Sequence, residues 1–413
     1  MQTVVIVGAS LAGTRAAETL RDEGFDGSIV LVGAEEHLPY DRPPLSKQYL
    51  SGEWSVERLA LIGDGELADL GIETRMATAA VGVDSGAHLV LLDDGSTLPY
   101  DGLVIATGAR PRMIPGLVAD GTRLHTIRSL DDSRRLAEHV RSGRVLGVIG
   151  GGFLGSEVAS VAAENGADVV VIERASTPMG DVLGAQVGAD MAELMREKGV
   201  RLRTGVSVSG VSIPAVGSSG SVDIALADGS SESVDAALIA IGAVPNIEWL
   251  ANSGLQIEDG LVCDRTLFAG DSIVGAGDVV RIRLIDGTIA RRSEHWTSAA
   301  EQGQRAAHNL LAGRDAATEF DSVPYVWSDQ FGVRIETFGR PRPDDEIERF
   351  AVAADAPAGV YLHRRDGLVT GCIGLAATRS IVGLRRHVHK GGSLDDAAEV
   401  LGAAVPSAMG SAR

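Results

Sequence analysis

The sequence predicts an α/β protein with two nested Rossmann-like dinucleotide-binding domains and a smaller α+β domain at the C-terminus. Two segments share one order of features, namely an apolar strand, a glycine turn, an Ala-rich stretch of helix length and a second apolar strand. The segments are VVIVGASLAGTRAAETL followed by SIVLV, and VLGVIGGGFLGSEVASVAAENGADVVVI. Their nearly continuous Val/Ile runs are typical of parallel strands that are buried on both faces. A chain of 413 residues also exceeds what one hydrophobic core usually holds.

The domain order follows from a second repeated pattern. Short strands and a turn precede an apolar strand twice, in DGLVIATGARP and in DAALIAIGAVP, which indicates one domain copy inserted into the other. After Phe320 the pattern becomes VPYVWSDQFGVRIETFG, strand-like with turns. We therefore expect a first domain over 1–113 and 245–322, a second over 114–244, a third over 323–401, and a flexible tail over 402–413.

Composition narrows the class of protein. The 52 glycines and 23% charged residues exclude a disordered or coiled-coil chain. The two cysteines, Cys263 and Cys372, belong to no CxxC pair, which favours a reducing compartment and argues against a structural zinc, any other metal centre or a dithiol redox centre. The first residues run directly into an apolar strand, and no uncharged apolar stretch reaches ~18 residues. We expect a cytoplasmic protein without a signal peptide or membrane span.

The charge is strongly negative and unevenly distributed. A net charge of −19 disfavours nucleic acid and anionic membranes as partners. From Arg281 onward the chain has 17 basic and 17 acidic residues, so the excess acid lies in the first 280 residues. Basic clusters in the neutral last third are therefore candidates for a docking surface.

The second glycine turn matches the dinucleotide-binding fingerprint. Gly150, Gly152 and Gly155, with Phe153 and Leu154 between them, form a G-x-G-x-x-G between a strand and a helix. The first glycine makes the turn, the second admits a pyrophosphate, and the third allows close packing of helix and strand. Glu173 follows at the end of the next strand, where a carboxylate accepts hydrogen bonds from a ribose diol and repels a 2′-phosphate. This pattern favours NAD over NADP.

The first glycine turn departs from that fingerprint. Ser10 replaces the middle glycine between Gly8 and Gly13, with Leu11 and Ala12 completing the turn. A serine fits there if its φ is negative and its hydroxyl reaches a phosphate. The acidic residue that would bind the ribose is less clear in this unit, because Gly33 and Ala34 separate the strand from the candidate Glu35.

These motifs together resemble a known family. Two nested dinucleotide units, ATG at 106–108 and GAGD at 275–278 are similar to the two-dinucleotide flavoprotein reductases. LPYDRPPLSK, IGAVPN, EHWTSAAEQG and VPYVWSDQ resemble the FAD-dependent ferredoxin reductases of oxygenase electron-transfer chains, to which the apoptosis-inducing-factor type flavoproteins are related. The resemblance extends from Val4 to about Leu384 and implies FAD and NADH as cofactors.

The resemblance implies a charged pair beside the flavin. Lys47 lies near the flavin N5 in the resembled family and pairs with an acid that is Glu157 here. An ammonium in this place stabilises the anionic reduced flavin, and its carboxylate partner limits the cost of desolvation. The alternatives are a solvated surface lysine and a carboxylate on the helix surface.

Further cofactor contacts are implied by the same resemblance. Arg42 corresponds to a pyrophosphate contact, Asp278 to a ribitol contact, and the backbone of His295 and Trp296 to the pyrimidine edge of the flavin. Arg128 matches a cofactor-contacting arginine, with helix capping by Ser129 or Asp131 as the alternative. The remaining candidates are Ala80 and Val81 on the adenine side, Ala106, Thr107 and Gly108 of the ATG motif, and Gly242 of the IGAVPN motif.

Three positions bear on specificity and electron exit. Trp327 aligns with an aromatic residue beside the flavin, where it lines an electron exit or fills a domain interface. Glu336 stands where relatives often have Gln, which puts its nicotinamide contact in doubt. Asp181 replaces an Arg that the family commonly has after the ribose acid, which again disfavours NADP.

The expected reaction is NADH:ferredoxin oxidoreduction. Disulfide and peroxide reductases need a cysteine facing the flavin, but the loop LPYDRPPLSKQYL contains none, and both cysteines are expected to be buried small hydrophobes. Electrons would pass to an acidic [2Fe–2S] ferredoxin serving a cytochrome P450 or a ring-hydroxylating oxygenase. The alternatives are a rubredoxin- or oxygen-reducing enzyme and a flavoprotein whose redox state controls partner binding. The candidate docking clusters are Arg281/Arg283, Arg291/Arg292, Arg364/Arg365, and Arg379, Arg385, Arg386, His387, His389 and Lys390.

Overall fold

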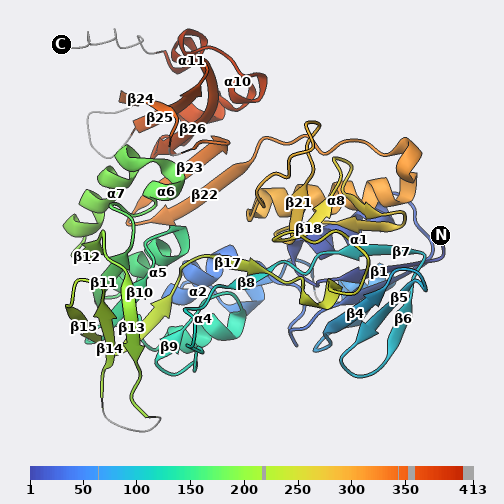
Figure 1. Cartoon of the computed structure of the whole chain (residues 1–413), viewed down its shortest axis with the longest axis horizontal. Coiled ribbons are helices and arrows are strands. Elements are labelled where there is room, and N and C mark those ends of the chain that lie inside the picture. The colour runs from blue at the N-terminus through green and yellow to red at the C-terminus, as the bar shows by residue number, and fades with distance from the viewer. Residues whose placement is uncertain (64, 216–219, 343, 352–358, 403–413) are drawn as a thin grey trace. The chain divides into compact units, whose positions relative to one another are not determined.

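The computed structural model describes residues 1–63, 65–215, 220–342, 344–351 and 359–402 (Figure 1). The chain divides into two compact units. The first contains residues 1–44, 54–110 and 243–322, and the second contains 45–53, 111–242 and the described residues from 323 onward. The chain therefore passes from one unit to the other after residues 44, 53, 110, 242 and 322. Of the expected tail, all but Gly402 lies outside the described residues.

A six-stranded sheet forms the first unit, in the order β19-β20-β7-β1-β2-β3. Its strands are β1 (Thr3–Val7), β2 (Ser28–Val32), β3 (Ile72–Arg75), β7 (Gly102–Ile105), β19 (Phe268–Gly270) and β20 (Ile273–Gly275). β1 pairs in parallel with both β2 and β7, as the first βαβ pattern predicts. Helices α1 (Leu11–Asp22) and α8 (Trp296–Ala312) pack so closely that a Cβ at Gly303 would lie 2.3 Å from the Ala12 carbonyl oxygen.

Short strands complete the first unit, in both antiparallel and parallel pairs. The β-rich segment before DGLVIATG forms a three-stranded sheet of β4 (Ala80–Asp84), β5 (Leu89–Leu92) and β6 (Thr97–Pro99). The other short elements are β8 (Ala109–Pro111) with β17 (Ala243–Pro245), β18 (Leu261–Cys263) with β21 (Val280–Ile282), helix α3 (Glu66–Asp69), and the 3-10 turns Val56–Leu59, Glu248–Leu250 and Arg314–Ala316.

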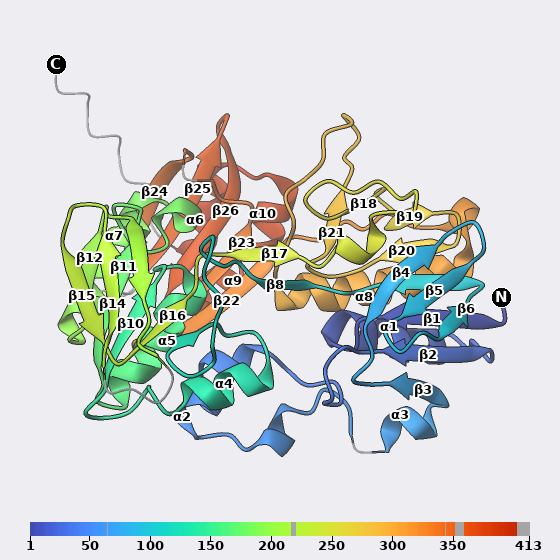
Figure 2. The ribbon, with the colours of Figure 1, turned by 60° about the horizontal axis from the view of Figure 1, so that its bottom comes forward.

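The second unit contains the second βαβ pattern. Its parallel sheet has the order β12-β11-β10-β16-β9, of which Figure 2 labels β12, β11, β10 and β16. The strands are β9 (Leu124–His125), β10 (Val145–Ile149), β11 (Asp168–Glu173), β12 (Arg201–Thr204) and β16 (Ala236–Ile239). The helices are α2 (Gln48–Ser51), α4 (Leu130–Leu136), α5 (Phe153–Glu164), α6 (Gly180–Leu183) and α7 (Ala185–Glu197), and a 3-10 turn spans Pro43–Ser46. An antiparallel sheet of β13 (Val208–Ser212), β14 (Val222–Leu226) and β15 (Ser231–Val234) places Ile224 and Val234 against Gly147 of β10.

The C-terminal segment forms a third sheet within the second unit, ordered β22-β23-β26-β25-β24 (Figure 1). Its elements are β22 (Tyr325–Gln330), β23 (Val333–Gly339), β24 (Glu346–Ala351), β25 (Gly359–Arg365), β26 (Leu368–Leu375), α9 (Thr378–Val382), α10 (Arg385–Lys390) and α11 (Leu394–Leu401). Phe331, Ile335 and Tyr361 belong to one hydrophobic core with Val158 of α5 and Leu183 of α6. The C-terminal sheet therefore shares its core with the helices of the second parallel sheet.

Candidate functional site

Gly8 and Gly13 fix the backbone of the first glycine turn. Gly8 has a φ of +120°, and a Cβ there would lie 2.1 Å from the Ala106 carbonyl oxygen, which no side chain tolerates. A Cβ at Gly13 would lie 1.9 Å from the Gly8 carbonyl oxygen. Ser10 caps α1 in an extended conformation with φ −122°, so the condition of negative φ for a serine in this turn is met.

The second glycine turn repeats this geometry. Gly150 has a φ of +105°, with a hypothetical Cβ 2.3 Å from the Ala240 carbonyl oxygen, and a Cβ at Gly155 would lie 2.0 Å from the Gly150 carbonyl oxygen. Gly152 differs, because nothing lies within 4 Å of the position that its Cβ would take. This open backbone precedes α5, and neither α5 nor α1 has a side-chain N-cap. Both turns thus offer uncapped N–H groups to a dinucleotide pyrophosphate, and the residues present fit FAD and NAD.

Glu173 lies beside the second turn at the end of β11. Its Oε2 accepts a hydrogen bond from the Gly151 N–H at 2.7 Å, and its Oε1 accepts one from the Ala175 N–H at 2.7 Å. The structure therefore holds the predicted ribose acid against the glycine turn. Arg174 follows it on the exposed surface, with its guanidinium 3.5 Å from the Asp181 carboxylate.

Arg42 connects the equivalent parts of the first turn. Its Nε donates to Ser10 Oγ at 3.2 Å, and its NH2 group lies 2.6 Å from Glu35 Oε1. Burial opposes the charge, but Tyr40 and Glu35 outweigh it and raise the pKa of Arg42. The structure thus brings together three residues that the sequence assigned separately to phosphate, ribose and pyrophosphate contacts.

The ATG and GAGD motifs lie at the ends of two neighbouring parallel strands of the first sheet, β7 and β20. The Ala106 N–H donates to the Val7 carbonyl at 2.8 Å, and Thr107 Oγ1 donates to the Asn246 carbonyl at 2.9 Å. The Gly277 N–H, next to Asp278, donates to Gln302 Oε1 of α8 at 2.9 Å. Gln302 is 2% exposed, and sequence reasoning missed it because glutamine in a helix gives no positional signal.

His295 and Trp296 lie at the start of α8. His295 is the N-cap residue in an extended conformation and Trp296 is the first helical residue, with its Nε1 donating to Asp41 Oδ1 at 2.7 Å. Burial lowers the pKa of His295, and the carboxylate of Asp278 offsets part of that shift.

Four further candidates occupy turns or strand ends. Ala80 and Val81 begin β4, with Val81 exposed. Gly242 has a φ of +110° and its carbonyl accepts from the Arg112 N–H at 2.9 Å. The Arg128 N–H donates to Asp132 Oδ2 at 3.1 Å, within a capping box in which Ser129 caps α4. Capping by Ser129 is thus confirmed, whereas the reciprocal acid is Asp132 and not Asp131.

Lys47 and Glu157 form a buried ion pair inside the second unit. Lys47 Nζ lies 2.7 Å from Glu157 Oε2, and the two residues are only 9% and 5% exposed. The solvated lysine and the surface carboxylate are therefore wrong as alternatives. Ser46 Oγ donates to Oε2 at 2.5 Å and Ser328 Oγ donates to Oε1 at 2.5 Å. Sequence reasoning missed both serines, although each lies inside a motif that carried the resemblance.

Trp327 lies within a stack of aromatic rings on β22 and β23. The Trp327 ring stacks on Tyr325 at 5.8 Å between centroids, Tyr325 stacks on Phe338 at 4.7 Å, and the Arg334 guanidinium lies 6.0 Å from the Trp327 centroid. The buried Glu336 accepts from Tyr325 OH at 2.7 Å and from Thr378 Oγ1. Glu336 is thus committed to bonds within the C-terminal segment, in agreement with the doubt about its nicotinamide contact.

Both cysteines are buried, as predicted. Cys263 lies in β18 and Cys372 in β26. Burial raises the pKa of the Cys263 thiol and raises that of Cys372 to about 12. Neither thiol is accessible as a thiolate nucleophile.

The basic clusters divide into engaged and exposed groups, and Arg291 of the first unit belongs with the exposed residues, without a salt bridge to any described residue. Arg281 donates to the Ile289 and Ala290 carbonyls, Arg292 pairs with Asp259 and Glu294, and Arg364 and Arg365 pair with Glu346 and Asp345. By contrast, Arg379, Arg386 and Lys390 on α9 and α10 are exposed and form no salt bridge with any described residue. We call these three residues, with the exposed Arg385, the α9–α10 basic face.

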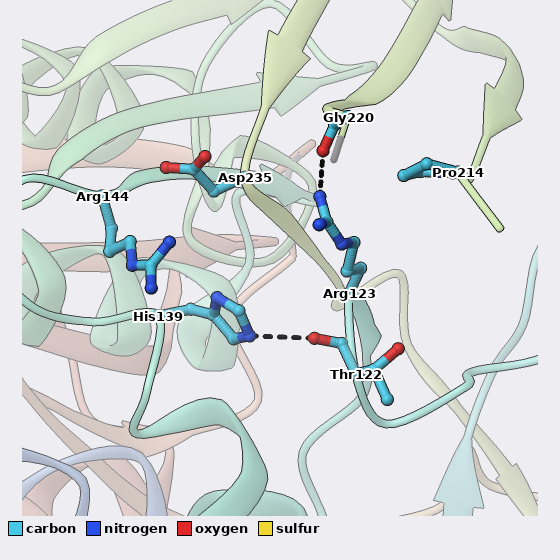
Figure 3. A pocket seen from close by; sticks show the side chains of 7 residues that line it. All are labelled: Thr122, Arg123, His139, Arg144, Pro214, Gly220 and Asp235. Atoms are coloured by element: carbon cyan, nitrogen blue, oxygen red, sulfur yellow. Dashed lines mark hydrogen bonds between the residues drawn. The ribbon is translucent and has the colours of Figure 1, made fainter. Parts of the chain in front are cut away.

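A cavity of about 510 Å³ lies at the amino-terminal ends of strands in the second parallel sheet (Figure 3). Arg123, Arg144 and Asp235 line it and directly precede β9, β10 and β16, whereas Gly150 follows β10. The parallel register therefore separates this cavity from the glycine turn, and the cavity is not the dinucleotide site.

Over the described part of the chain, no helix has the length and apolar character needed to cross a bilayer.

Comparisons with known proteins agree with this geometry. The family described as "Pyridine nucleotide-disulphide oxidoreductase" matches residues 2–303, and "Reductase C-terminal" matches residues 325–404. The anthranilate 1,2-dioxygenase system ferredoxin–NAD(+) reductase component of Burkholderia cepacia is 33% identical over 95% of each chain. The structure of the covalent putidaredoxin reductase–putidaredoxin complex matches with a TM-score of 0.88 and 28% identity, covering 98% of this chain and 99% of that one. The ferredoxin reductase for the CYP199A2 system from Rhodopseudomonas palustris also matches with a TM-score of 0.88 and 28% identity, over 95% and 96% of the two chains.

Proposed function

Because this chain belongs to the pyridine nucleotide-disulphide oxidoreductase family, we propose that it is an FAD-containing NADH:ferredoxin oxidoreductase of an oxygenase system. The observation that carries this proposal is the pair of glycine turns, each between a strand and a helix of a separate sheet, joined to a match with the reductase C-terminal family. FAD accepts a hydride from NADH and releases single electrons, which is the chemistry that a one-electron carrier requires.

We assign FAD to the first unit and NADH to the second. The first turn, Arg42 and Glu35 would bind the pyrophosphate and ribose of FAD, and the start of α8 would supply backbone N–H groups. The second turn and Glu173 would bind NADH. The Glu173 carboxylate disfavours a 2′-phosphate, and the nearby Asp181 adds further negative charge.

We assign the Lys47–Glu157 pair to tuning the charge around the flavin. The pair is buried, and burying an ammonium alone would cost a large hydration energy. Pairing with the Glu157 carboxylate offsets part of that cost. The pair thus keeps a positive group in a dry place, and the Ser46 and Ser328 hydroxyls complete the hydrogen bonds of the carboxylate.

We assign ferredoxin docking to the α9–α10 basic face. Acidic [2Fe–2S] ferredoxins would be repelled by a chain of net charge −19 unless a local basic surface met them, because exposed charges are screened beyond ~8–10 Å. On this face Arg379, Arg386 and Lys390 are exposed and form no salt bridge with any described residue, and they lie close together in sequence on α9 and α10. NADH as donor and two free buried cysteines support a cytoplasmic location.

An anaerobic titration with NADH, followed by ferredoxin-dependent reduction of cytochrome c, tests the proposal. We expect a yellow protein that bleaches with one equivalent of NADH and turns over only when a ferredoxin is present. Colourless protein that cannot be reconstituted with FAD, or no turnover with any [2Fe–2S] ferredoxin, would contradict it. Ferredoxins from dioxygenase and P450 systems compared in parallel identify the oxygenase class.

Oxygen reduction is disfavoured by a specific observation. Both thiols are buried with raised pKa values, so the chain has no accessible cysteine for peroxide chemistry. Measuring oxygen consumption in the same assay checks this, and we expect a rate well below that of ferredoxin reduction.

A further inference from the structure

The Glu157 carboxylate receives donors from two segments that are distant in sequence. Lys47 and Ser46 reach Oε2 from the segment before α2, at 2.7 and 2.5 Å, and Ser328 reaches Oε1 from β22 at 2.5 Å. Glu157, Ser46 and Ser328 are 5%, 2% and 0% exposed. Both carboxylate oxygens are therefore held by protein groups away from water.

The direction of the Ser328 hydrogen bond is set by Gln330. Gln330 lies two residues later on the same face of β22, and its Nε2 donates to Ser328 Oγ at 3.0 Å. A serine hydroxyl has one proton, so a hydroxyl that accepts from Gln330 directs its own proton to Glu157. The order Gln330 to Ser328 to Glu157 thus fixes the carboxylate as an acceptor from the C-terminal sheet.

A second hydrogen bond also joins α5 to the end of β22, so we can ask whether Ser328 is needed merely to attach the strand to the helix. Ser160 of α5, one turn after Glu157 and also buried, accepts from the Phe331 N–H at 2.6 Å. This contact fastens the strand end to α5 without touching the ion pair. Attachment therefore does not require a polar group at Ser328, and a buried hydroxyl there is costly unless the carboxylate needs it.

We propose that Ser328 is a positioning residue for the Lys47–Glu157 pair. It fixes the Glu157 carboxylate from the C-terminal sheet, and through that carboxylate it fixes the Lys47 ammonium. The C-terminal sheet thereby acts on flavin reduction through a hydrogen bond to the pair. This inference rests on the proposed function, in which the pair tunes the charge around the flavin.

The test compares Ser328→Ala with Ser160→Ala in the FAD-loaded protein. Both variants remove one buried serine hydroxyl between α5 and the β22 end, so both are expected to lower the melting temperature similarly. Only Ser328→Ala should slow flavin reduction by saturating NADH, at least fivefold in stopped flow, and shift the midpoint potential of the bound flavin. Ser328→Thr, which retains a hydroxyl, should return the rate to within twofold of the unmodified protein.

Glu157→Gln separates the two hypotheses. If Glu157→Gln alters the rate and the potential while Ser328→Ala behaves like Ser160→Ala, the inference is wrong and the proposed function stands. If Glu157→Gln also changes neither quantity, the assigned role of the ion pair is wrong and the inference fails with it. Should Ser328→Ala lose its flavin, Gln330→Ala replaces it, because loss of the orienting amide should slow reduction at least twofold, and an unchanged rate overturns the inference.

Discussion

At the scale of single residues, the site is characterised by two carboxylates that are held by hydrogen bonds from neighbouring groups. Glu173 accepts two backbone N–H groups, and Glu157 accepts an ammonium and two hydroxyls. These carboxylates differ in purpose, because Glu173 lies beside an open glycine turn and Glu157 is enclosed. Their neighbours therefore determine what each substitution should change.

Replacing Glu173 with Gln should weaken coenzyme discrimination. A neutral amide no longer repels a 2′-phosphate but still offers one oxygen to a backbone N–H. We expect the ratio of kcat/KM for NADH over NADPH to fall roughly tenfold, equivalent to ~1.4 kcal/mol. Asp181→Asn is the matched control on the exposed surface and should lower the ratio less. An unchanged ratio in Glu173→Gln would remove its assigned role.

His125 should make stability depend on pH. Burial, followed by the neighbouring His139, lowers its pKa to about 4. The unfolded chain, with a pKa near 6.5, binds more protons between pH ~6.5 and ~4, so stability falls as the pH falls through this window. We expect urea midpoints to drop from pH 7 to pH 5, and His125→Gln to reduce that drop, by up to about 2 kcal/mol in unfolding free energy. The exposed His389→Gln should leave it unchanged, and an undiminished drop in His125→Gln would refute the prediction.

At the scale of elements, the two strand–turn–helix units were predictable because their chemistry is local. Gly13 and Gly155 are required by contacts with the carbonyls of Gly8 and Gly150, five residues earlier, and such contacts leave a fixed spacing in the sequence. Gly8 and Gly150 also meet the more distant Ala106 and Ala240 carbonyls, but their positive φ is a local property of the turn. The contacts of Ser46, Ser328 and Gln302 were not predictable. Each acts across segments separated by tens to hundreds of residues, and serine or glutamine has no periodic signature.

Two alanine substitutions in the second turn should have different effects, one on stability and the other on NADH binding. Gly155→Ala places a Cβ 2.0 Å from the Gly150 carbonyl oxygen and should lower the melting temperature by roughly 5 °C or more. Gly152→Ala meets no protein atom within 4 Å, so it should fold normally but raise the KM for NADH about tenfold by obstructing the pyrophosphate. Calorimetry and steady-state kinetics measure the two effects. Equal melting temperatures for the two variants would contradict the packing argument.

At the scale of the whole molecule, net charge and sequence position could not identify which basic residues are available to bind a partner. The sequence identified paired arginines in the neutral last third, but it could not show that Arg281, Arg292, Arg364 and Arg365 are already engaged by acids or carbonyls. Those partners come from separate loops and strands. The folded structure is therefore needed to distinguish these engaged arginines from the exposed residues of the α9–α10 basic face.

Reversing charge on that face should weaken ferredoxin binding selectively. We expect Arg386→Glu with Lys390→Glu to raise the KM for ferredoxin about tenfold at low salt, with the difference shrinking as salt is added. Reduction of ferricyanide by NADH should stay unchanged. Arg196→Glu on the exposed side of α7 is the control, and an equal rise in KM for that variant would locate docking elsewhere.

The order of strands in the first sheet has a consequence for synthesis on the ribosome. β7, made by residue 105, lies between β1 and β20, but β20 is translated only at residues 273–275. Until then one side of β7 has no hydrogen-bonding neighbour from this sheet, while the residues of the inserted unit are still emerging. A nascent chain with an unpaired apolar edge is prone to aggregation, so chaperone capture over this interval should raise the yield of native protein, and slower translation over it should lower the yield.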